Sequence, residues 1–178
     1  NPEGHTSHLT VVDKNGMIVS LTQTIGPTMG SKVATPGLGF LYAQTMGGYL
    51  GKVEPGLRVP SHISPVIVFK NDKPFLVLGT PGGSTIITTV LQNILNVTLH
   101  GMNIKEAVSS PRIHSQWLPD MVFYEKYGLS SDIIENLKVR GHDMKLRGNI
   151  GEANGIMINE KGYWGGADSR GENIAIGY

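Results

Sequence analysis

The sequence predicts an α+β fold in which antiparallel sheets carry helices on their outer faces. Three segments have the pattern of β-hairpins, one long segment has the periodicity of an amphipathic helix, and glycine is frequent, at 24 of 178 residues. Glycine without a repeating period is typical of a strand-rich chain with many tight turns. The length suits one domain with a sizeable core, and no internal repeat or linker divides the chain.

The predicted hairpins consist of paired runs of β-branched and apolar residues around short polar turns. The first pairs residues 9–13 with 17–24 around Lys14-Asn15-Gly16, and an Asn-Gly pair is a strong hairpin signal. The second and third pair residues 63–70 with 74–79 and residues 156–159 with 163–168. Hairpins of this kind favour antiparallel sheets.

The strongest helical pattern covers residues 84–100, where apolar side chains recur at helical spacing without an internal Gly or Pro. Two shorter helices are predicted at residues 104–109, with Asn103 as the N-cap, and at residues 132–140, with Ser131 as the N-cap. Residues 26–60 differ from the rest, being rich in Gly, Pro, Thr and Lys. A loop of this length inside a compact domain is usually functional or disordered.

Charge and composition exclude several functions. The net charge of +1 argues against binding to nucleic acid or to an anionic membrane surface, because both need a concentrated basic face. The absence of cysteine excludes disulfides, thiolate zinc sites and cysteine nucleophiles. No apolar run reaches the roughly 18 residues of a membrane-spanning helix. The six histidines lack metal-ligand spacing, so no metal site is expected.

Two segments carry residue types suited to catalysis. Residues 5–8 (His-Thr-Ser-His) place hydroxyls and imidazoles just before the first strand. Residues 79–84 (Gly-Thr-Pro-Gly-Gly-Ser) join a strand to the long helix, where glycine amides beside a helix N-terminus can hold an anion or a developing oxyanion. A plain strand-to-helix turn is the alternative interpretation, because the motif is short.

Five motifs in this order resemble the small subunit of the γ-glutamyltranspeptidase family. They are residues 6–13 (TSHLTVVD), 60–65 (PSHISP), 79–87 (GTPGGSTII), 110–120 (SPRIHSQWLPD) and 166–170 (GADSR). The resemblance covers nearly the whole chain. It implies the four-layer αββα sandwich of the N-terminal nucleophile hydrolases, with antiparallel sheets and outer helices.

Members of this family are made as precursors that cut themselves before a threonine. The resemblance places the cut between His5 and Thr6, so that residues 1–5 are the tail of a preceding large subunit and residues 6–178 are a single-domain small subunit. Ser7 and Thr10 are alternative nucleophiles that fit the motif less well. A free α-amine titrates at about 7.7–8.0 and can serve as the base that a threonine hydroxyl needs. Self-cleavage would thus create the nucleophile and its base together.

The resemblance also implies roles for other residues. Thr24 matches a threonine whose hydroxyl bonds the nucleophile, and a hairpin would bring it beside Thr6. A threonine with an ordinary role in a strand is the alternative. Gly82 and Gly83 match the pair of glycines that forms the oxyanion hole. No cofactor is expected for this chemistry.

The expected substrate-binding residues depart from the family. Without gaps, Gly26 stands where the family has Asn, and Thr45 and Gly48 stand where it has Gln and Asp. Ser61 is kept from a pair of serines, while His62 replaces the second. An α-ammonium group would then lose its carboxylate partner, a loss of about 1.5–3 kcal/mol. Misplaced gaps, or ligands supplied by the large subunit, are the alternative explanation.

By this resemblance we expect a γ-glutamyltranspeptidase-like amide hydrolase or acyltransferase that forms an acyl-enzyme at Thr6 and acts on glutathione or related γ-glutamyl compounds. Its expected partner is the large subunit of the same precursor, and its expected location, by resemblance, is periplasmic or extracellular. Two alternatives remain open. One is an amidase or acylase of the same fold without glutamyl specificity, and the other is an unprocessed homologue without catalytic activity.

Overall fold

The structure is a computed structural model that describes residues 4–46 and 52–178. In chain order its elements are β1 (Gly4–Val12), β2 (Ile18–Pro27), β3 (Val66–Lys70), β4 (Lys73–Gly79), the 3₁₀ turn η1 (Gly83–Thr85), α2 (Ile86–Thr98), α3 (Ile104–Ser109), β5 (Ile113–His114), β6 (Val122–Glu125), α4 (Ser131–Val139), β7 (Met144–Arg147), β8 (Asn154–Asn159) and β9 (Gly162–Ala167). The strands form the sheets β1-β2, β3-β4-β8-β9 and β5-β6-β7.

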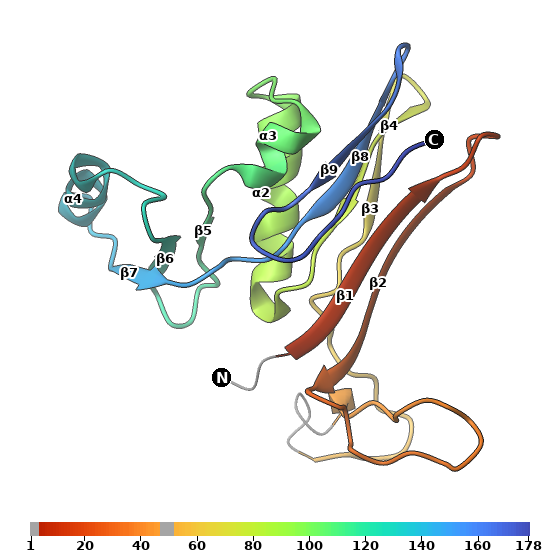
Figure 1. Ribbon diagram of the computed structural model, residues 1–178. Coiled ribbons are helices and arrows are strands. Elements are labelled where there is room, and N and C mark those ends of the chain that lie inside the picture. The colour runs from red at the N-terminus through yellow and green to blue at the C-terminus, as the bar shows by residue number, and fades with distance from the viewer. Residues whose placement is uncertain (1–3, 47–51) are drawn as a thin grey trace.

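The main body of the molecule is layered. Helices α2 and α3 cover one face of the four-stranded sheet, and the hairpin β1-β2 lies against the other face (Figure 1). The layers therefore follow one another as helices, sheet and second sheet. These correspond to three of the four layers expected for an αββα sandwich, and the α+β class is confirmed.

All three predicted hairpins are present as antiparallel pairs. In the first, the Asp13 carboxylate accepts the backbone N–H groups of Asn15 and Met17, each at 2.8 Å, and so stabilises the turn. In the second, Asn71 and Asp72 have φ values of 51° and 61°. Two consecutive left-handed residues match the right-handed twist of the flanking strands. Local turn chemistry therefore fixes these pairings.

The helices begin close to the predicted residues. The long helix α2 is preceded by the turn η1, so the first predicted turn of residues 84–100 is 3₁₀ in form. Asn103 caps α3 as predicted, and a reciprocal bond joins its backbone N–H to the Glu106 carboxylate at 2.9 Å. The predicted cap of α4 is wrong: Ser130, not Ser131, precedes its first residue.

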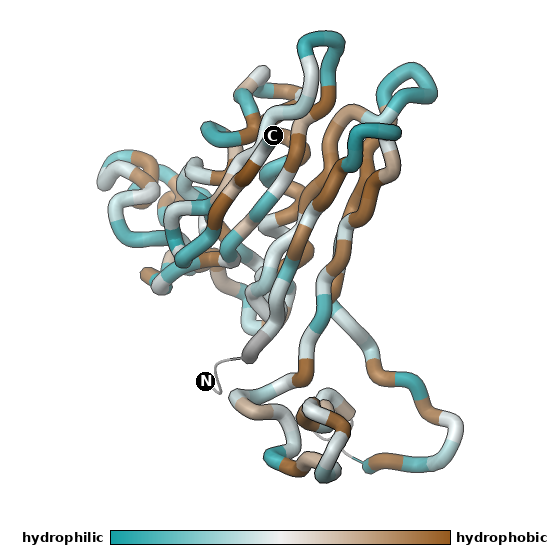
Figure 2. The backbone as a smooth tube through the Cα atoms, turned by 45° about the vertical axis from the view of Figure 1, so that its right-hand side comes forward, coloured by the Kyte–Doolittle hydropathy of each residue, from teal (hydrophilic) through white to brown (hydrophobic). Residues whose placement is uncertain are grey.

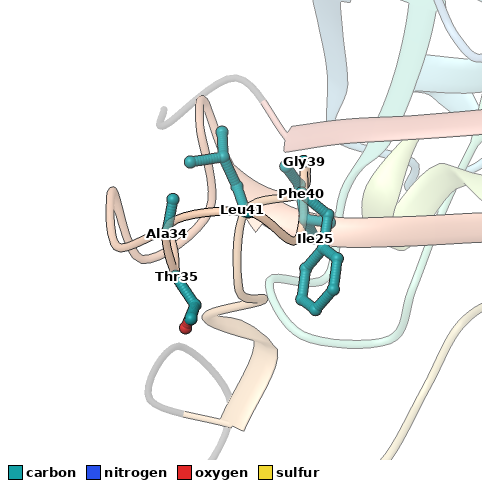
Figure 3. Close-up of a pocket in the computed structure, with 7 residues that line it drawn as sticks. Ile25, Ala34, Thr35, Gly39, Phe40 and Leu41 are labelled. Atoms are coloured by element: carbon teal, nitrogen blue, oxygen red, sulfur yellow. The ribbon is translucent and has the colours of Figure 1, made fainter.

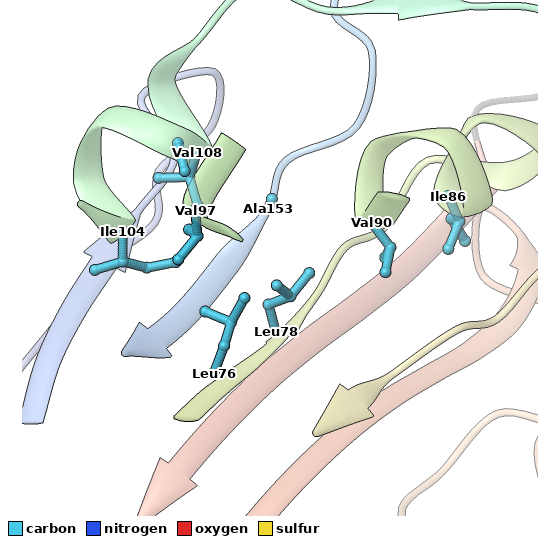
Figure 4. Packing of buried hydrophobic residues seen from close by; sticks show 9 residues of the cluster. Leu76, Leu78, Ile86, Val90, Val97, Ile104, Val108 and Ala153 are labelled. Carbon is cyan, nitrogen blue, oxygen red and sulfur yellow. The ribbon is translucent and has the colours of Figure 1, made fainter. Parts of the chain in front are cut away.

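The core lies between the helices and the four-stranded sheet (Figure 4). Apolar side chains of α2 and α3 pack against those of β4, and the buried cluster consists of Leu76, Leu78, Ile86, Val90, Val97, Ile104, Ala107, Val108 and Ala153. Burying a large apolar side chain stabilises a fold by about 1.5–3 kcal/mol. This interface therefore anchors β4, whose end leads into the glycine-rich turn.

The hairpin β1-β2 has its polar face turned inward. Apart from Val12 and Ile18 next to the turn, the inward residues are threonines, a serine and a histidine, whereas Leu9, Val11, Val19 and Leu21 on the other face are 43–50% exposed. The alternation of apolar and polar residues is visible along both strands (Figure 2). A polar layer thus lies between the two sheets, next to the apolar core.

The remaining parts are less regular. Strands β6 and β7 pair in parallel, and the helix α4 lies in the connection between them. The helix was predicted from the sequence, whereas the parallel pairing was not. Residues 28–46 form a loop in which Ala34 and Leu41 make an isolated bridge. Among the described residues, no helix has the length and apolar character that a membrane crossing requires. Those residues also contain no cluster of three metal-ligating side chains.

Candidate active site

Thr6 and Thr24 are direct partners across the hairpin β1-β2. Side chains on directly opposed residues of an antiparallel pair have Cβ atoms about 4.5–5.5 Å apart, which is within reach of two hydroxyl groups. Both side chains are half-buried. The structure therefore brings the predicted nucleophile and its predicted partner together.

The pairing of β1 and β2 is irregular beside the predicted cleavage point. Gly4 pairs with Pro27 and Thr6 with Thr24, so three steps on β2 face two steps on β1. The peptide bond between His5 and Thr6 lies within this irregular stretch of β1. Bulges of this kind are over-represented next to active sites, where they re-aim side chains. The predicted tail is described only at its last two residues, which belong to β1.

Gly26 supports the irregular stretch through its backbone. Its N–H donates to the Thr24 hydroxyl at 3.0 Å, and its φ of 89° favours glycine. A Cβ at this position would lie 3.3 Å from the carbonyl carbon of Gln44 and 3.4 Å from the N of Thr45. The structure thus places Gly26 against the backbone at Thr45, close to Thr24. Gly48 lies outside the described residues.

The glycine-rich turn lies at the same end of the molecule as the start of β1 (Figure 1). Gly82 and Gly83 have φ values of 144° and 59°. The Gly82 carbonyl accepts the backbone N–H of Thr85 at 3.2 Å and the Thr85 hydroxyl at 2.9 Å. In a planar trans peptide the N–H of Gly83 points opposite to the Gly82 carbonyl, so it is directed away from Thr85. This orientation suits an oxyanion donor.

Thr80 and Gly151 support this turn from behind. The Thr80 hydroxyl donates to the Pro81 carbonyl at 2.5 Å and accepts the backbone N–H of Glu152 at 2.8 Å. A Cβ on Gly151 would lie 2.8 Å from the Thr80 hydroxyl oxygen. Thr80 is fully buried. The turn is therefore fixed against the loop that contains Gly151, and not only by its own glycines.

A buried ionic network holds that loop. The Arg112 guanidinium donates to the carbonyls of Ile150 and Gly151 at 2.8 and 3.1 Å, and to the Asp168 carboxylate at 2.6 Å. Arg170 bonds Asp168 and the Glu125 carboxylate, at 3.0 and 2.6 Å. Arg112 and Asp168 are 2% and 1% exposed, so these charges depend on one another for solvation.

The carboxylates of this network remain ionised. Burial raises the pKa of Asp168, but the charges of Arg112 and Arg170 and the hydrogen bonds that both residues donate together hold the pKa below its ordinary value. Burial acts on Glu125 in the same way, and hydrogen bonds from Arg170 and from the backbone N–H of Ile150 lower its pKa overall. In the sequence, Arg112, Asp168 and Arg170 stand out only as members of motifs. Their connection to the glycine-rich turn has no local signal, because it joins residues far apart in the chain.

Ser61 and His62 lie in the segment before β3. The Ser61 hydroxyl accepts the backbone N–H of Ile63 at 3.1 Å, and the Ser64 hydroxyl donates to the His62 carbonyl at 2.9 Å. Burial lowers the pKa of His114, and the nearby His62 lowers it further. His114 in turn bonds Thr88 in the first turn of α2 at 2.8 Å. The described contacts of Ser61 and His62 are thus mainly with the backbone of their own segment.

An apolar groove adjoins the hairpin next to Thr24 and was not predicted. It has a volume of about 600 Å³ and is lined by Ile25, Ala34, Thr35, Gly37, Gly39, Phe40 and Leu41. Figure 3 shows Ile25 and Phe40 close together where β2 ends. The lining contains no charged side chain. The alternation of β2 places Ile25 on the opposite side of the strand from Thr24.

The layered sheets, with a threonine at the start of an inner strand and a glycine-rich turn at the same end of the molecule, have the fold of the N-terminal nucleophile hydrolases. The family model for γ-glutamyltranspeptidase matches residues 1–178. The chain belongs to the γ-glutamyltranspeptidase family.

Relatives and solved structures agree with this assignment. A glutathione hydrolase proenzyme from Escherichia coli is 38% identical over 97% of the chain, and the acylase ACY 1 proenzyme from a Pseudomonas strain is 32% identical over 91%. The T380A mutant of Helicobacter pylori γ-glutamyltranspeptidase superposes with a TM-score of 0.86 and 41% identity, covering 92% of this chain and 99% of the matched chain. The chain spans 33% and 30% of the two proenzymes, about a third of their length.

Proposed function

We propose that this chain carries the catalytic centre of an amide hydrolase or acyltransferase that forms an acyl-enzyme on Thr6. The observation that carries the proposal is the pairing of Thr6 with Thr24 beside the turn of Gly82 and Gly83. A nucleophile, a hydroxyl that positions it and a pair of backbone donors, with the α-amine of Thr6 as the base, are the groups that acyl transfer needs.

The same hydroxyl serves two reactions in this proposal. In the precursor, the Thr6 hydroxyl attacks the carbonyl of His5, and the resulting ester is hydrolysed to leave Thr6 with a free α-amine. In the mature enzyme, that amine takes the hydroxyl proton as Thr6 attacks the substrate amide. The proton then passes to the leaving amine, and water or an acceptor amine releases the acyl group.

Thr24 and the two glycines have separate tasks in this sequence. The bond from Gly26 N–H to the Thr24 hydroxyl does not use the Thr24 proton, which we assign to the oxygen of Thr6. The bond from the Thr24 hydroxyl to the Thr6 oxygen would orient the lone pair with which Thr6 attacks. The N–H groups of Gly82 and Gly83 would stabilise the oxyanion, a contribution worth about 10²–10³ in rate per donor.

The experiment is a mass measurement on the full-length precursor and its variants. Thr6→Ala is expected to abolish both self-cleavage and turnover, and Thr6→Ser to keep a part of each. Ser7→Ala is the matched control, because Ser7 is exposed and alternates to the other face of β1. Cleavage before residue 6 in the Thr6→Ala protein would contradict the assignment. A wild-type protein that stays at precursor mass would instead favour a homologue without catalysis.

Substrate choice follows from the residues around Thr24. Related proteins are named as glutathione hydrolases and as an acylase, which favours an amide substrate of the γ-glutamyl type or of a wider acyl class. Gly26 cannot be replaced by a larger polar residue without backbone strain, and residues 26–52 contain no Asp or Glu. A substrate ammonium would find no carboxylate in that segment. We therefore propose weak activity on substrates that carry a free α-amine.

The direct comparison uses γ-glutamyl-p-nitroanilide and the glutaryl analogue, which lacks the amine. We expect kcat/KM for the glutaryl compound to equal or exceed that for the glutamyl compound, and transfer to dipeptide acceptors to be weak. A glutamyl preference of about tenfold, equal to about 1.4 kcal/mol, would show that an ammonium site exists elsewhere and that the protein has ordinary γ-glutamyl specificity.

The proposed partner is the large subunit of the same precursor. The described residues correspond to about a third of the related proenzymes, and the outward face of the hairpin exposes Leu9, Val11, Val19 and Leu21. An apolar strip on an inner sheet of an αββα sandwich requires a cover. The large subunit would supply that cover and the fourth layer. A periplasmic or extracellular location is proposed with it, which fractionation of the producing cells would test.

A further inference from the structure

His8 lies two residues after Thr6 on β1, and its side chain therefore shares the inward face with Thr6. Its partner across the hairpin is Thr22, and the two side chains bond through His8 Nδ1 and the Thr22 hydroxyl at 2.7 Å. Thr22 is 8% exposed. The imidazole is thus held between the strands, two residue pairs along from Thr6 and Thr24 and on the same face.

The other side of the ring rests on Gly79 at the end of β4. A Cβ built on Gly79 would lie 2.3, 2.5 and 2.8 Å from His8 Cε1, Nδ1 and Nε2. Gly79 does not have a left-handed φ, so its backbone conformation is open to any residue. Glycine is required at position 79 because the imidazole ring of His8 occupies the space of a Cβ, and not because of the backbone conformation.

The position of this contact connects two parts of the catalytic centre. Gly79 is buried and stands three residues before Gly82, in the segment that also contains Thr80. His8 stands two residues after the nucleophile. Burial lowers the pKa of His8 to about 4, so the ring is neutral at neutral pH and sits against the backbone without a charge. Its Nε2 is enclosed and has no hydrogen-bond partner in the described part of the chain.

We propose that His8 is a positioning residue, which sets the spacing between the Thr6 hydroxyl and the turn of Gly82 and Gly83. The ring acts as a spacer of fixed thickness, oriented by Thr22 and seated on Gly79. This inference rests on the proposed function, because it assumes that Thr6 attacks and that the turn receives the oxyanion. A misplacement of about 1 Å between reacting groups can cost about 10²-fold in rate.

A role in stability alone makes different predictions from a role in positioning. If the ring only fills space, its removal lowers the melting temperature and leaves the chemical step of the folded enzyme intact. If it sets the spacing, its removal slows acyl-enzyme formation, while KM changes little. A change at Gly79 must then act through the ring, because a Cβ there meets His8 first.

The experiment is a double-mutant cycle in the full-length precursor, with His8→Ala, Gly79→Ala and both together. The readouts are the burst rate of p-nitroaniline release, kcat, KM and the melting temperature. Each single variant is expected to lower the burst rate and kcat, by up to about 10²-fold. The double variant is expected to be no slower than the slower single variant, because the added methyl group no longer meets a ring.

Two further variants separate fold from position. His8→Asn keeps an amide nitrogen or oxygen near the place of Nδ1 and is expected to restore part of kcat by retaining the bond to Thr22. Gly148→Ala is the control, because a Cβ there meets nothing within 4 Å and its φ is not left-handed. It should leave every readout unchanged. Thr22→Val tests the bond without touching Gly79, and a fall in kcat is expected.

The cycle has clear outcomes. Additive losses from His8→Ala and Gly79→Ala, or losses confined to KM and melting temperature, would overturn the inference. If Thr6→Ala still turned over substrate, the proposed function itself would fail, whatever the cycle gave. If Thr6→Ala were inactive and the losses from His8→Ala and Gly79→Ala were additive, the proposed function would stand and only the positioning role of His8 would be wrong. For a variant whose precursor cleaves itself too slowly to give mature enzyme, the rate of self-cleavage is measured in place of kcat, because both reactions use the Thr6 hydroxyl.

Discussion

Gly151 lies directly against Gly82: a Cβ on Gly82 would be 3.2 Å from the Gly151 Cα and 2.6 Å from the Thr85 hydroxyl oxygen. The two glycines come from different parts of the chain, one in the turn before α2 and the other in the loop before β8. The contact fixes the turn from outside its own sequence. Because of this contact, a side chain at Gly82 would clash with its neighbours, whereas one at Gly83 would not.

Gly82→Ala and Gly83→Ala are therefore expected to differ. Alanine at Gly82 meets Thr85 and Gly151 and must move the turn, and loss of one oxyanion donor typically lowers kcat by about 10²–10³-fold. Alanine at Gly83 meets nothing within 4 Å and adds only the strain of a left-handed residue, about 1 kcal/mol. Steady-state kinetics of both variants check this. Equal losses of kcat would contradict the structural distinction.

A structure with a bound substrate mimic tests the donors directly. Both amides, of Gly82 and Gly83, are expected at the reacting carbonyl oxygen, within the 2.7–3.1 Å or so that such donors require. Amides more than about 4 Å away would remove these glycines from the proposed mechanism.

Thr24→Val should lower kcat by about 10²-fold, because it removes the hydroxyl opposite Thr6 and keeps the β-branched shape. Self-cleavage should slow as well, since it uses the same Thr6 hydroxyl. Thr24→Ser, which keeps the hydroxyl, should retain most activity. Thr98→Val, at the far end of α2, is the matched control and should change neither rate. Full activity in Thr24→Val would leave Thr24 with an ordinary strand role.

Asp168→Asn is expected to destabilise the fold by about 3–5 kcal/mol, because it leaves the buried Arg112 charge without its partner. Glu135→Gln is the matched control. It breaks an ion pair with Lys138 on the surface of α4, where water screens both charges, and should leave the unfolding midpoint unchanged. Denaturant unfolding of the three proteins gives the comparison. Similar midpoints for Asp168→Asn and wild type would show that the network is replaceable.

Stability should fall in two stages as pH is lowered. Burial lowers the folded pKa of His8 to about 4 from an unfolded value of 6.5, so the unfolded state binds more protons between these values and stability declines as pH falls through this range. His114 shifts in the same direction. Asp168 and Glu125 have lowered pKa values, so their contribution is present above the unfolded carboxyl pKa and is lost below it.

Melting temperatures measured from pH 7 to pH 3 check this prediction. The decline between pH 6.5 and pH 4 should be smaller in His8→Asn, which removes one titrating group, and should persist in part through His114. The steeper loss at lower pH should remain in that variant. A slope above pH 4 that His8→Asn leaves unchanged would contradict the burial of a neutral His8.

Local signals explain which parts of the fold the sequence predicted. Asn15-Gly16, the caps of α3 and the uninterrupted period of α2 act within a few residues, and each element appears where it was expected. The parallel pair β6 and β7 depends on a crossover through α4 and has no local signature. The cap of α4 was misplaced by one residue, because Ser130 and Ser131 are equally good caps.

The site divides in the same way. Thr6, Gly82 and Gly83 belong to recognisable motifs and Thr24 matches a single family position, and the structure places them at one end of the molecule. The support from Gly151 and Arg112, and the seat of His8 on Gly79, join distant segments that no local pattern connects. The orientation of the hairpin was also beyond a pattern-based prediction. The alternation of residues predicts that the hairpin has one apolar and one polar face. The usual preference for burying apolar residues would turn Leu9 and Val11 inward, but the structure turns them outward.

The polar inner face of the hairpin has a consequence for how the molecule opens. Strand β4 is secured by apolar burial, whereas the hairpin β1-β2 is attached to it through polar side chains, such as the Ser20 hydroxyl of β2, which donates to the Leu78 carbonyl at 3.3 Å. Local opening reaches first the elements with the least buried apolar area. Amide protons of β1 and β2 should therefore exchange with solvent before those of β4 and β8. The strand that carries the nucleophile is thus aligned by hydrogen bonds and is the first to detach.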